Sequence, residues 1–395
     1  MSLRFLTAGE SHGPALVAIL EGMPAGLKVS TEAIDRDLRR RQRGYGAGPR
    51  MKIEQDMAQI LSGVLAGETS GAPVAMLVQN KDHAKWRGRP IAPFTSPRPG
   101  HADLSGLAKY GYQDLRPTSE RASARETAAR VAVGALCRQF LAACGIQVGG
   151  YVIQIGEVTA ALEKMPMEER IEKAQSSAVA CPAAAAAERM LKRIRKVMEE
   201  RDTLGGVIEV AALGVPPGLG SHVQWDRRLE ARLAAAVLSI QAMKGVEFGP
   251  AFENAGQTGT QVQDAIFLED GELVRKTNRS GGIEGGMSTG QPVIVRAAMK
   301  PIASTLTPQQ TVDLTSGEEV QTKYERSDFC PVPRAVVIVE AMVAFVLADA
   351  LLEKLGGDSM QEILPRLAAL RRMRIADLRL KGEAQVFWPE PTQEA

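Results

Sequence analysis

Aromatic side chains and histidines are scarce in this chain of 395 residues. Phenylalanine, tryptophan and tyrosine together make up 4% of the residues, so a core must be built mainly from aliphatic side chains. Histidine occurs four times, as His12, His83, His101 and His222. Because imidazole is the side chain that titrates close to neutral pH, acid–base chemistry at that pH has few groups to draw on.

Cysteine is also rare, with four copies and no Cys-x-x-Cys pair, and a chain of this length needs no disulfides to fold. Cys137 and Cys144 fall in a helical pattern and are predicted to be buried as small apolar side chains. The N-terminal residues lack the apolar stretch of a signal peptide. The most apolar run, residues 335–352, is interrupted by Glu340 and Asp349 and is predicted to fall short of a membrane span. We therefore expect a cytoplasmic protein with reduced thiols and no membrane partner.

The charges nearly cancel, with 48 Lys and Arg against 46 Asp and Glu. This balance argues against a protein whose whole surface binds nucleic acid. The four histidines are dispersed and no acidic cluster has ligand spacing, so no metal site is predicted. Neither a Gly-x-Gly-x-x-Gly loop after the first strand nor a Walker motif is present, which weakens the usual nucleotide-binding folds and favours an α+β architecture.

Two parts of the chain echo each other. Residues 16–27 resemble residues 207–219, and residues 70–76 resemble residues 289–295. Chance similarity of Gly/Pro turns is the alternative, but the echoes follow in the same order, and a long helix closes each part. We predict one domain over residues 1–395, made of two echoing units at about 1–150 and 205–360. A charged, alanine-rich stretch at about 161–201 is predicted to be a helical insertion with solvated faces.

Two histidines lie in glycine-containing loops. Residues 9–13 read Gly-Glu-Ser-His-Gly and follow the first apolar strand, where glycines let the backbone approach a ligand closely. A structural histidine is the alternative for His12. The second loop, Arg-Pro-Gly-His-Ala-Asp at residues 98–103, surrounds His101 with an arginine and a carboxylate.

Arginines form a local cluster despite the balanced total. Their planar forks bind carboxylates and phosphates at two points, whereas a solvated helix face is the alternative. At residues 119–127 a helix start carries further arginines, where backbone N–H groups favour an anion. Ser123 and Glu126 there also fit a capping box. The first cluster comprises Arg36, Arg39, Arg40, Arg41, Arg43 and Arg50.

Taken in order, the motifs of the chain resemble the chorismate synthase family. They are GESHG from residue 9, RRQRGYGAGPRMKIEQD from residue 40, RPGHAD from residue 98, RASARET from residue 121, GGIEGGMSTGQP from residue 281, Lys300-Pro, RSDFCPVPR from residue 326 and EAMVAFVLAD from residue 340. The resemblance covers nearly the whole chain. It implies a β-α-β sandwich assembled as a homotetramer, and a carbon–oxygen lyase of the shikimate pathway. That enzyme converts 5-enolpyruvylshikimate 3-phosphate to chorismate and phosphate by a 1,4-anti elimination, and it requires reduced FMN without net redox change.

The resemblance also implies roles for individual residues. His12 would protonate the departing phosphate, His101 would lie near the flavin N1 region, and Asp349 would act as a base at the flavin N5. Substrate contacts would come from Arg41, Arg50, Arg98, Arg125 and Arg326, with Arg41 also at an NADP contact. Flavin contacts would come from Arg121, Ala122, Ser123, Gln241, Ala242, Gly285, Lys300, Pro301, Ile302, Ala303, Ser304 and Arg326.

Two further expectations come with the family. Many members carry arginine where this chain has Ala47, so Arg43 or Arg50 is expected to supply that contact. The chain carries no added flavin-reductase module, so an external reductase, with NADPH as the indirect reductant, is expected to supply reduced FMN. Two other classes remain open. An anion-binding regulator would explain the arginines but not the histidines, and a phosphoryl transferase would need a Mg²⁺ carboxylate set that the sequence does not show.

Overall fold

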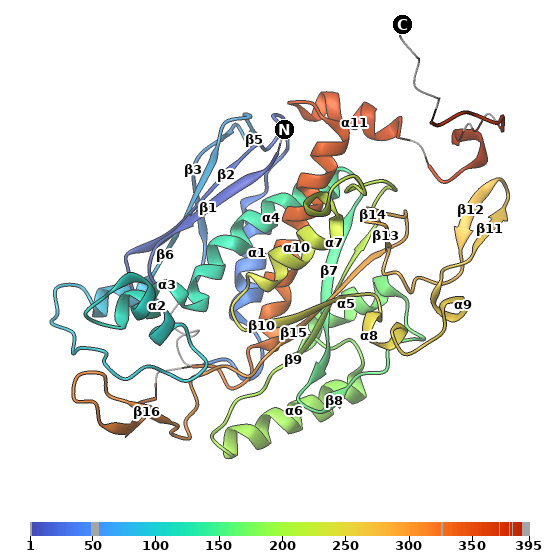
Figure 1. The fold of residues 1–395 in the computed structure, drawn as a ribbon. Coiled ribbons are helices and arrows are strands. Elements are labelled where there is room, and N and C mark those ends of the chain that lie inside the picture. The colour runs from blue at the N-terminus through green and yellow to red at the C-terminus, as the bar shows by residue number, and fades with distance from the viewer. Residues whose placement is uncertain are drawn as a thin grey trace, which may run out of the picture.

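The computed structural model describes residues 2–48, 55–324, 327–370, 372–378, 380 and 382–388. Its principal elements are two antiparallel sheets with long helices packed between them (Figure 1). Helices and strands are both abundant, and the sheets pair without parallel strands, so the predicted α+β class and sandwich fold are confirmed.

The first sheet alternates between a buried and an exposed face. In its central strands Leu16, Ala18, Leu20, Val74 and Met76 are buried, whereas the residues that alternate with them are half-buried or exposed. This period of two is that of a sheet with one face on the core. In spatial order the strands are β1 (Arg4–Ala8), β2 (Ala15–Glu21), β6 (Val74–Gln79) and β3 (Ala58–Ser62).

The second sheet is buried on both faces at its centre. In β9 five successive residues, 208–212, are all buried, which requires cover on each side. The long helices cover one side, and residues of α5 (Met167–Ser176) pack on the other. In spatial order the strands are β10 (Met243–Phe248), β15 (Val293–Met299), β9 (Gly206–Leu213), β7 (Gln147–Ile155) and β8 (Val158–Thr159).

Four helices lie between the sheets: α1 (Thr31–Gln42), α4 (Thr127–Ala143), α7 (Leu229–Leu238) and α10 (Val332–Leu355). Helix α4 packs on β2 and β6, and α10 packs on β7, β9 and α4. Helices α4 and α10 meet tightly at Gly134, where a Cβ atom would lie 2.2 Å from the Cβ of Ala341. Glycine is therefore what lets α4 and α10 approach each other here.

The remaining elements lie around this sandwich. The helices are α2 (Asp103–Tyr110), α3 (Arg116–Ala122), α6 (Ala184–Glu199), α8 (Ala251–Asn254), α9 (Gly259–Val262) and α11 (Met360–Ala368), with 3₁₀ turns η2 (Lys81–Lys85), η3 (Ala124–Glu126), η4 (Trp225–Arg227) and η5 (Ile375–Asp377). Two-stranded ribbons are formed by β4 (Val64–Leu65) with β5 (Glu68–Thr69), β11 (Ile266–Glu269) with β12 (Glu272–Arg275), β13 (Ile283–Glu284) with β14 (Met287–Ser288), and β16 (Gln310–Val312) with β17 (Glu319–Gln321).

The two sheets share one order and one connectivity. The first reads β1-β2-β6-β3, and the four principal strands of the second read β7-β9-β15-β10, with α1 and α7 and then α4 and α10 at matching points along the chain. This correspondence supports the duplicated organisation, which we retain as a proposal. Helices α5 and α6 lie within residues 161–201. Each buries one apolar stripe, which includes Ile171 in α5 and Ile194 in α6.

One expectation about the long apolar helix was wrong. By length and composition α10 could cross a membrane, and Glu340 and Asp349 within its apolar stretch do not exclude this. However, 89% of its most apolar window is buried inside the protein, so α10 serves as the central core helix. Cys137 and Cys144 are buried as predicted, and Cys181 and Cys330 are buried as well.

Candidate active site

The loop that carries His12 depends on a glycine at the end of β1. Gly9 has a φ of +109°, and a Cβ atom there would lie 2.3 Å from the carbonyl oxygen of Ala15. Only glycine tolerates this close approach, so the chain turns sharply between β1 and β2. The turn leaves the His12 side chain 25% exposed at the edge of the sheet.

The imidazole of His12 is held by Glu120 of α3. Its Nδ1 lies 2.7 Å from Oε1 of Glu120, and the backbone N–H of His12 donates to Oε2 of the same carboxylate. The indole of Trp86 covers the ring, with centroids 4.4 Å apart. His83, for which the sequence indicated no function, has its Nδ1 2.8 Å from the carbonyl oxygen of His12. His222 is exposed.

His101 is held in a similar way by Asp103. Its Nδ1 lies 2.6 Å from Oδ1 of Asp103, a carboxylate that is fully buried. The guanidinium of Arg98 donates to both oxygens of Asp103 and to the hydroxyl of Ser119. Burial alone would raise the pKa of Asp103, but hydrogen bonds from Arg98 and His101 hold that pKa well below its usual value.

Helix α3 connects the two histidine loops. Its consecutive residues Ser119 and Glu120 bind Arg98 and His12 respectively. Figure 1 shows α2 and α3 at one end of the first sheet, the end at which β1 finishes and β2 starts. The structure thus brings His12, His101 and Arg98 to one end of the molecule.

Arg41 and Arg125 lie deeper at the same end. They are 1% and 4% exposed, and both contact the buried carboxylate of Asp56. Arg41 also donates to Thr127, and Arg125 to the side-chain oxygen of Asn80. Burial, together with the nearby charges of Arg334 and Arg125, lowers the pKa of the Arg41 guanidinium. These contacts hold both arginines in place inside the protein. Their guanidinium groups place positive charge beneath the histidine loops.

The other predicted substrate residues, Arg50 and Arg326, lie outside the described residues. Among the described residues next to them, Asp328 accepts a hydrogen bond from the backbone N–H of Gly48 at 2.7 Å and pairs with Arg334. The chain following Arg326 therefore packs against the glycine loop that precedes Arg50.

The first group of predicted flavin residues borders a cavity of about 400 Å³. Arg121 and Gln241 line it, together with Thr7 and Glu126. The side-chain oxygen Oε1 of Gln241 is buried without a hydrogen-bond partner, so a donor group on a bound molecule could satisfy it. Ala122 and Ser123 end α3 beside this wall and are half-buried.

The prediction of a capping box formed by Ser123 and Glu126 was wrong. Ser123 does cap a helical turn, since its hydroxyl accepts from the backbone N–H of Arg125. Glu126 does not reach back to Ser123. Its carboxylate binds Thr7, Arg130 and Gln241 instead.

The second group of flavin residues lies next to the His101 loop. The Nζ of Lys300 donates to the carbonyl oxygen of Gly100, and the backbone N–H of Lys300 donates to Ala242. Pro301 to Ser304 continue this segment, and the Ile302 carbonyl accepts from Thr203. Ala242 and Lys300 are thereby placed together with the His101 loop.

Gly285 lies away from these groups. Its neighbour Gly286 lies at the start of α7, where its carbonyl oxygen accepts from the backbone N–H of Leu229. Gln241 lies beyond the other end of that helix. At 1.5 Å per residue, the ten residues of α7 separate them by about 15 Å.

Asp349 lies at the opposite end of the first sheet from His12. Its Oδ1 accepts from the backbone N–H of Leu3 at 2.6 Å, and its Oδ2 accepts from Arg232. Leu3 precedes β1 and His12 follows it, so the whole strand, about 17 Å long, lies between them. The expected role of Asp349 as a base beside the flavin does not fit this placement.

Glu120, Asp56 and Asn80 belong to the site but were not predicted from the sequence. Glu120 lies in the segment 119–127 and Asp56 ends the motif that starts at residue 40, so a search for the carboxylates that pair with the histidines and arginines could have found them. No local signal marked Asn80, whose amide spans the Gly13 carbonyl and Arg125.

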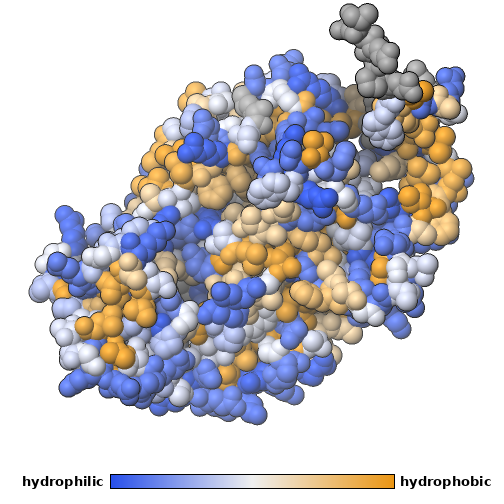
Figure 2. All heavy atoms as spheres, viewed as in Figure 1, coloured by the Kyte–Doolittle hydropathy of each residue, from blue (hydrophilic) through white to orange (hydrophobic). Residues whose placement is uncertain are grey.

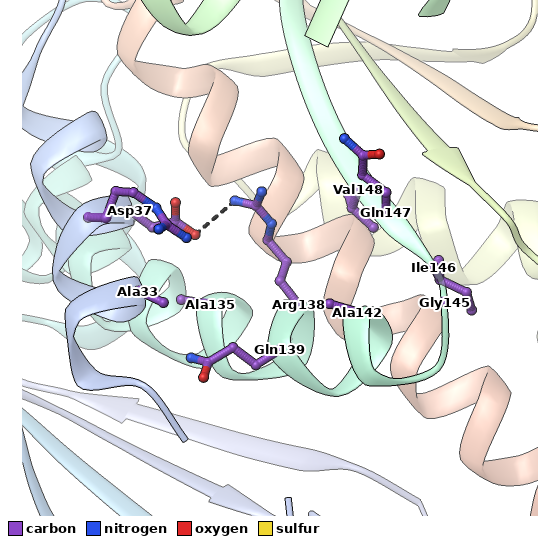
Figure 3. A pocket seen from close by; sticks show the side chains of 11 residues that line it. Ala33, Asp37, Ala135, Arg138, Gln139, Ala142, Gly145, Ile146, Gln147 and Val148 are labelled. Carbon is purple, nitrogen blue, oxygen red and sulfur yellow. Dashed lines mark hydrogen bonds and ion pairs between the residues drawn. The ribbon is translucent and has the colours of Figure 1, made fainter. Parts of the chain in front are cut away.

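A second cavity of about 280 Å³ lies between α1, the end of α4 and the start of β7 (Figure 3). Figure 3 shows Arg138 pointing toward Asp37 in its wall, where the two form an ion pair of 2.8 Å. Its lining includes Ala142, near the C-terminal end of α4, whereas the histidine loops lie near the N-terminal end. This cavity is therefore separate from the site. Within the described ranges, no group of three or more His, Cys, Asp or Glu residues could hold a metal ion.

Two carboxylate-held histidines, an arginine-rich floor and an adjoining cavity define an α+β enzyme that acts on an anionic substrate. A family model described as chorismate synthase matches residues 3–352. The chain is 53% identical to chorismate synthase of Desulforudis audaxviator, with 92% of this chain and 95% of that protein covered. It is 53% identical to the enzyme of Aquifex aeolicus, with 92% and 96% covered. A crystal structure of chorismate synthase matches with a TM-score of 0.77 at 46% identity, covering 93% of this chain and 97% of the other. The chain belongs to the chorismate synthase family.

Proposed function

We propose that this chain catalyses the 1,4-anti elimination of phosphate from 5-enolpyruvylshikimate 3-phosphate, which gives chorismate. The observation that carries the proposal is the pair of histidine–carboxylate contacts at one end of the sandwich, next to buried arginines, in a member of this family. The substrate carries a phosphate and two carboxylates, which guanidinium groups bind well.

The chain's own residues divide the work. Arg98 lies at the mouth of the site as a substrate contact, and Arg41 and Arg125 add positive charge from beneath. Arg50 and Arg326 remain predicted substrate contacts, and Arg41 remains the predicted NADP contact. His12 donates a proton to the departing phosphate. His101 holds a proton near the flavin. Asp349 is omitted, since Leu3 and Arg232 occupy its carboxylate far from both histidines.

The cavity beside Arg121 fits a flavin in the chemistry of its lining. Arg121 offers a cation, Gln241 offers an unsatisfied acceptor, and Lys300 lies close to the His101 loop. Arg121, Ala122, Ser123, Gln241, Ala242 and residues 300–304 would hold FMN in this proposal, and Gly285 and Arg326 remain untested members of the set. When bound, reduced FMN supplies transient reducing power that loosens the bond to the leaving phosphate.

An anaerobic assay tests this function. Protein, 5-enolpyruvylshikimate 3-phosphate and chemically reduced FMN are mixed without oxygen, and phosphate release and the diene absorbance of chorismate are followed. Both signals should rise together and only with reduced flavin. Phosphate release without flavin would indicate a phosphatase, and binding without either signal would indicate a regulator.

The assembly and supply of cofactor are part of the same proposal. We place the chain in a homotetramer in the cytoplasm, supplied with reduced FMN by an external reductase that draws on NADPH. Exposed apolar side chains support an assembly: Figure 2 shows them gathered over the β11–β12 hairpin, where Ile266 is 59% and Leu268 61% exposed. Sedimentation equilibrium of the purified protein would give the mass of the assembly, and a monomer at micromolar concentration would contradict it.

A further inference from the structure

Glu120 contacts the His12 loop at three points. Its two carboxylate oxygens bind the ring Nδ1 and the backbone N–H of His12, each at 2.7 Å. Its backbone carbonyl accepts from the N–H of Ser11 at 3.2 Å. One residue of α3 therefore fixes both the course of the loop and the rotation of the imidazole.

The local surroundings keep this carboxylate ionised. The side chain of Glu120 is 14% exposed and that of His12 is 25% exposed, so water screens their contact only in part. Burial alone would raise the pKa of Glu120, but the hydrogen bonds from the His12 ring and backbone, with the charge of Arg116, hold that pKa below its usual value.

An ionised carboxylate can only accept hydrogen bonds, so Nδ1 of His12 must carry a hydrogen in this contact. In this proposal the reacting proton is therefore the one carried by the other nitrogen, Nε2. Only the imidazolium form, which has a hydrogen on each nitrogen, can give up the proton of Nε2 and keep its Nδ1–H. When Nε2 transfers its proton to a phosphate oxygen, the ring becomes neutral, keeps its Nδ1–H, and Glu120 stays ionised.

We propose that Glu120 is the positioning residue of His12, setting the tautomer and orientation in which Nε2 delivers a proton to the leaving phosphate. This role rests on the proposed function of His12. Glu120 itself does not touch the reacting atoms. Its neighbour Ser119 holds Arg98 of the other histidine loop, so α3 keeps the two loops in register.

The variant Glu120→Gln keeps the size of the side chain and removes its charge. It should lower kcat by roughly 10- to 100-fold, as loss of a carboxylate behind a working histidine does, while KM changes little. The matched control is Glu157→Gln, which removes an exposed carboxylate from an ion pair with Arg193 and should leave kcat unchanged. Thermal unfolding of both variants reports whether they fold.

A double-mutant cycle separates positioning from general structural support. In the His12→Ala background, Glu120→Gln should cost almost nothing further in kcat, because its effect passes through the missing imidazole. If the two losses multiply instead, Glu120 acts independently and the assignment is overturned. An active wild-type protein with an unaffected Glu120→Gln variant would reject this role and leave the proposed function standing.

A second readout needs neither flavin nor substrate. The chain has only four histidines, so ¹⁵N spectra of histidine-labelled protein can be assigned by comparison with His12→Ala. His12 should show protonation at Nδ1 in the wild type and in Glu157→Gln, and should shift toward the Nε2–H form in Glu120→Gln. An unchanged tautomer in Glu120→Gln would overturn the role.

Discussion

At the scale of single residues, His12 and His101 have the same arrangement. Each Nδ1 lies within 2.7 Å of a carboxylate oxygen, from Glu120 in one case and Asp103 in the other. An ionised carboxylate only accepts hydrogen bonds, so each Nδ1 is the donor in its contact. Under the proposed function, the two histidines serve two different proton positions in one reaction.

Replacing either histidine tests their roles in turnover. His12→Ala and His101→Ala should each lower kcat by roughly 10²- to 10⁴-fold, the range typical of general acid–base groups. Steady-state rates under the anaerobic conditions above measure this loss. His222→Ala is the matched control, since that side chain is exposed. Full activity of both variants would reject the assignment.

Replacement of Asp349 is expected to affect stability and not turnover. Asp349→Asn should leave kcat unchanged and lower the free energy of unfolding by about 1–2 kcal/mol, because the carboxylate binds Leu3 and the partly buried Arg232. Denaturant unfolding and the anaerobic assay together measure this. A large loss of kcat with normal stability would return Asp349 to the catalytic set.

At the scale of elements, the packing of α4 against α10 decides how the sandwich is filled. Both helices are apolar on nearly all sides because each contacts a sheet and other helices. Their closest approach, at Gly134 and Ala341, leaves no room for another methyl group. The N-terminal end of α4 in turn supplies Thr127 to Arg41, so the helix contact also positions the floor of the site.

Gly134→Ala tests this contact. The added methyl group should destabilise the protein by about 3 kcal/mol, because backbone atoms of Ala341 lie in its place. Ala341→Gly removes one of the clashing atoms, so the double variant should lose less stability than the sum of the two single losses. Urea unfolding of the three variants provides the comparison, and strict additivity would show that the two residues do not meet.

At the scale of the whole molecule, a buried ion cluster joins α1, α4, α10 and β7. Glu340 of α10, which is 1% exposed, binds Arg40 and Arg138 and accepts from the backbone N–H of Gly150. Burial acts to raise the pKa of Glu340, but the two arginines hold it below its usual value. The cluster thus ties both proposed units to each other through charge.

Glu340→Gln should lower the free energy of unfolding by about 3 kcal/mol at pH 7, because two arginines lose a buried partner. A carboxyl whose pKa is lowered by folding stabilises the protein above its unfolded pKa of 4.5, and this stabilisation disappears as the pH falls through the lower folded value. The difference between variant and wild type should therefore shrink below about pH 4. Unfolding curves at several pH values measure it, and a constant difference would contradict the linkage.

Much of this protein could be predicted from local sequence. Local sequence patterns account for β2, β9 and α4, because each has its own apolar period and its own stop signal. The loops of His12 and His101 were also predictable, since glycines and short motifs mark them.

The tertiary structure decided which groups meet. Glu120 reaches His12 across 108 positions, and Asp349 reaches Leu3 across 346. Local patterns cannot specify such pairs, because only the packing of the sheets and helices decides which distant side chains meet. Where they meet away from water, a hydrogen bond between them is screened less.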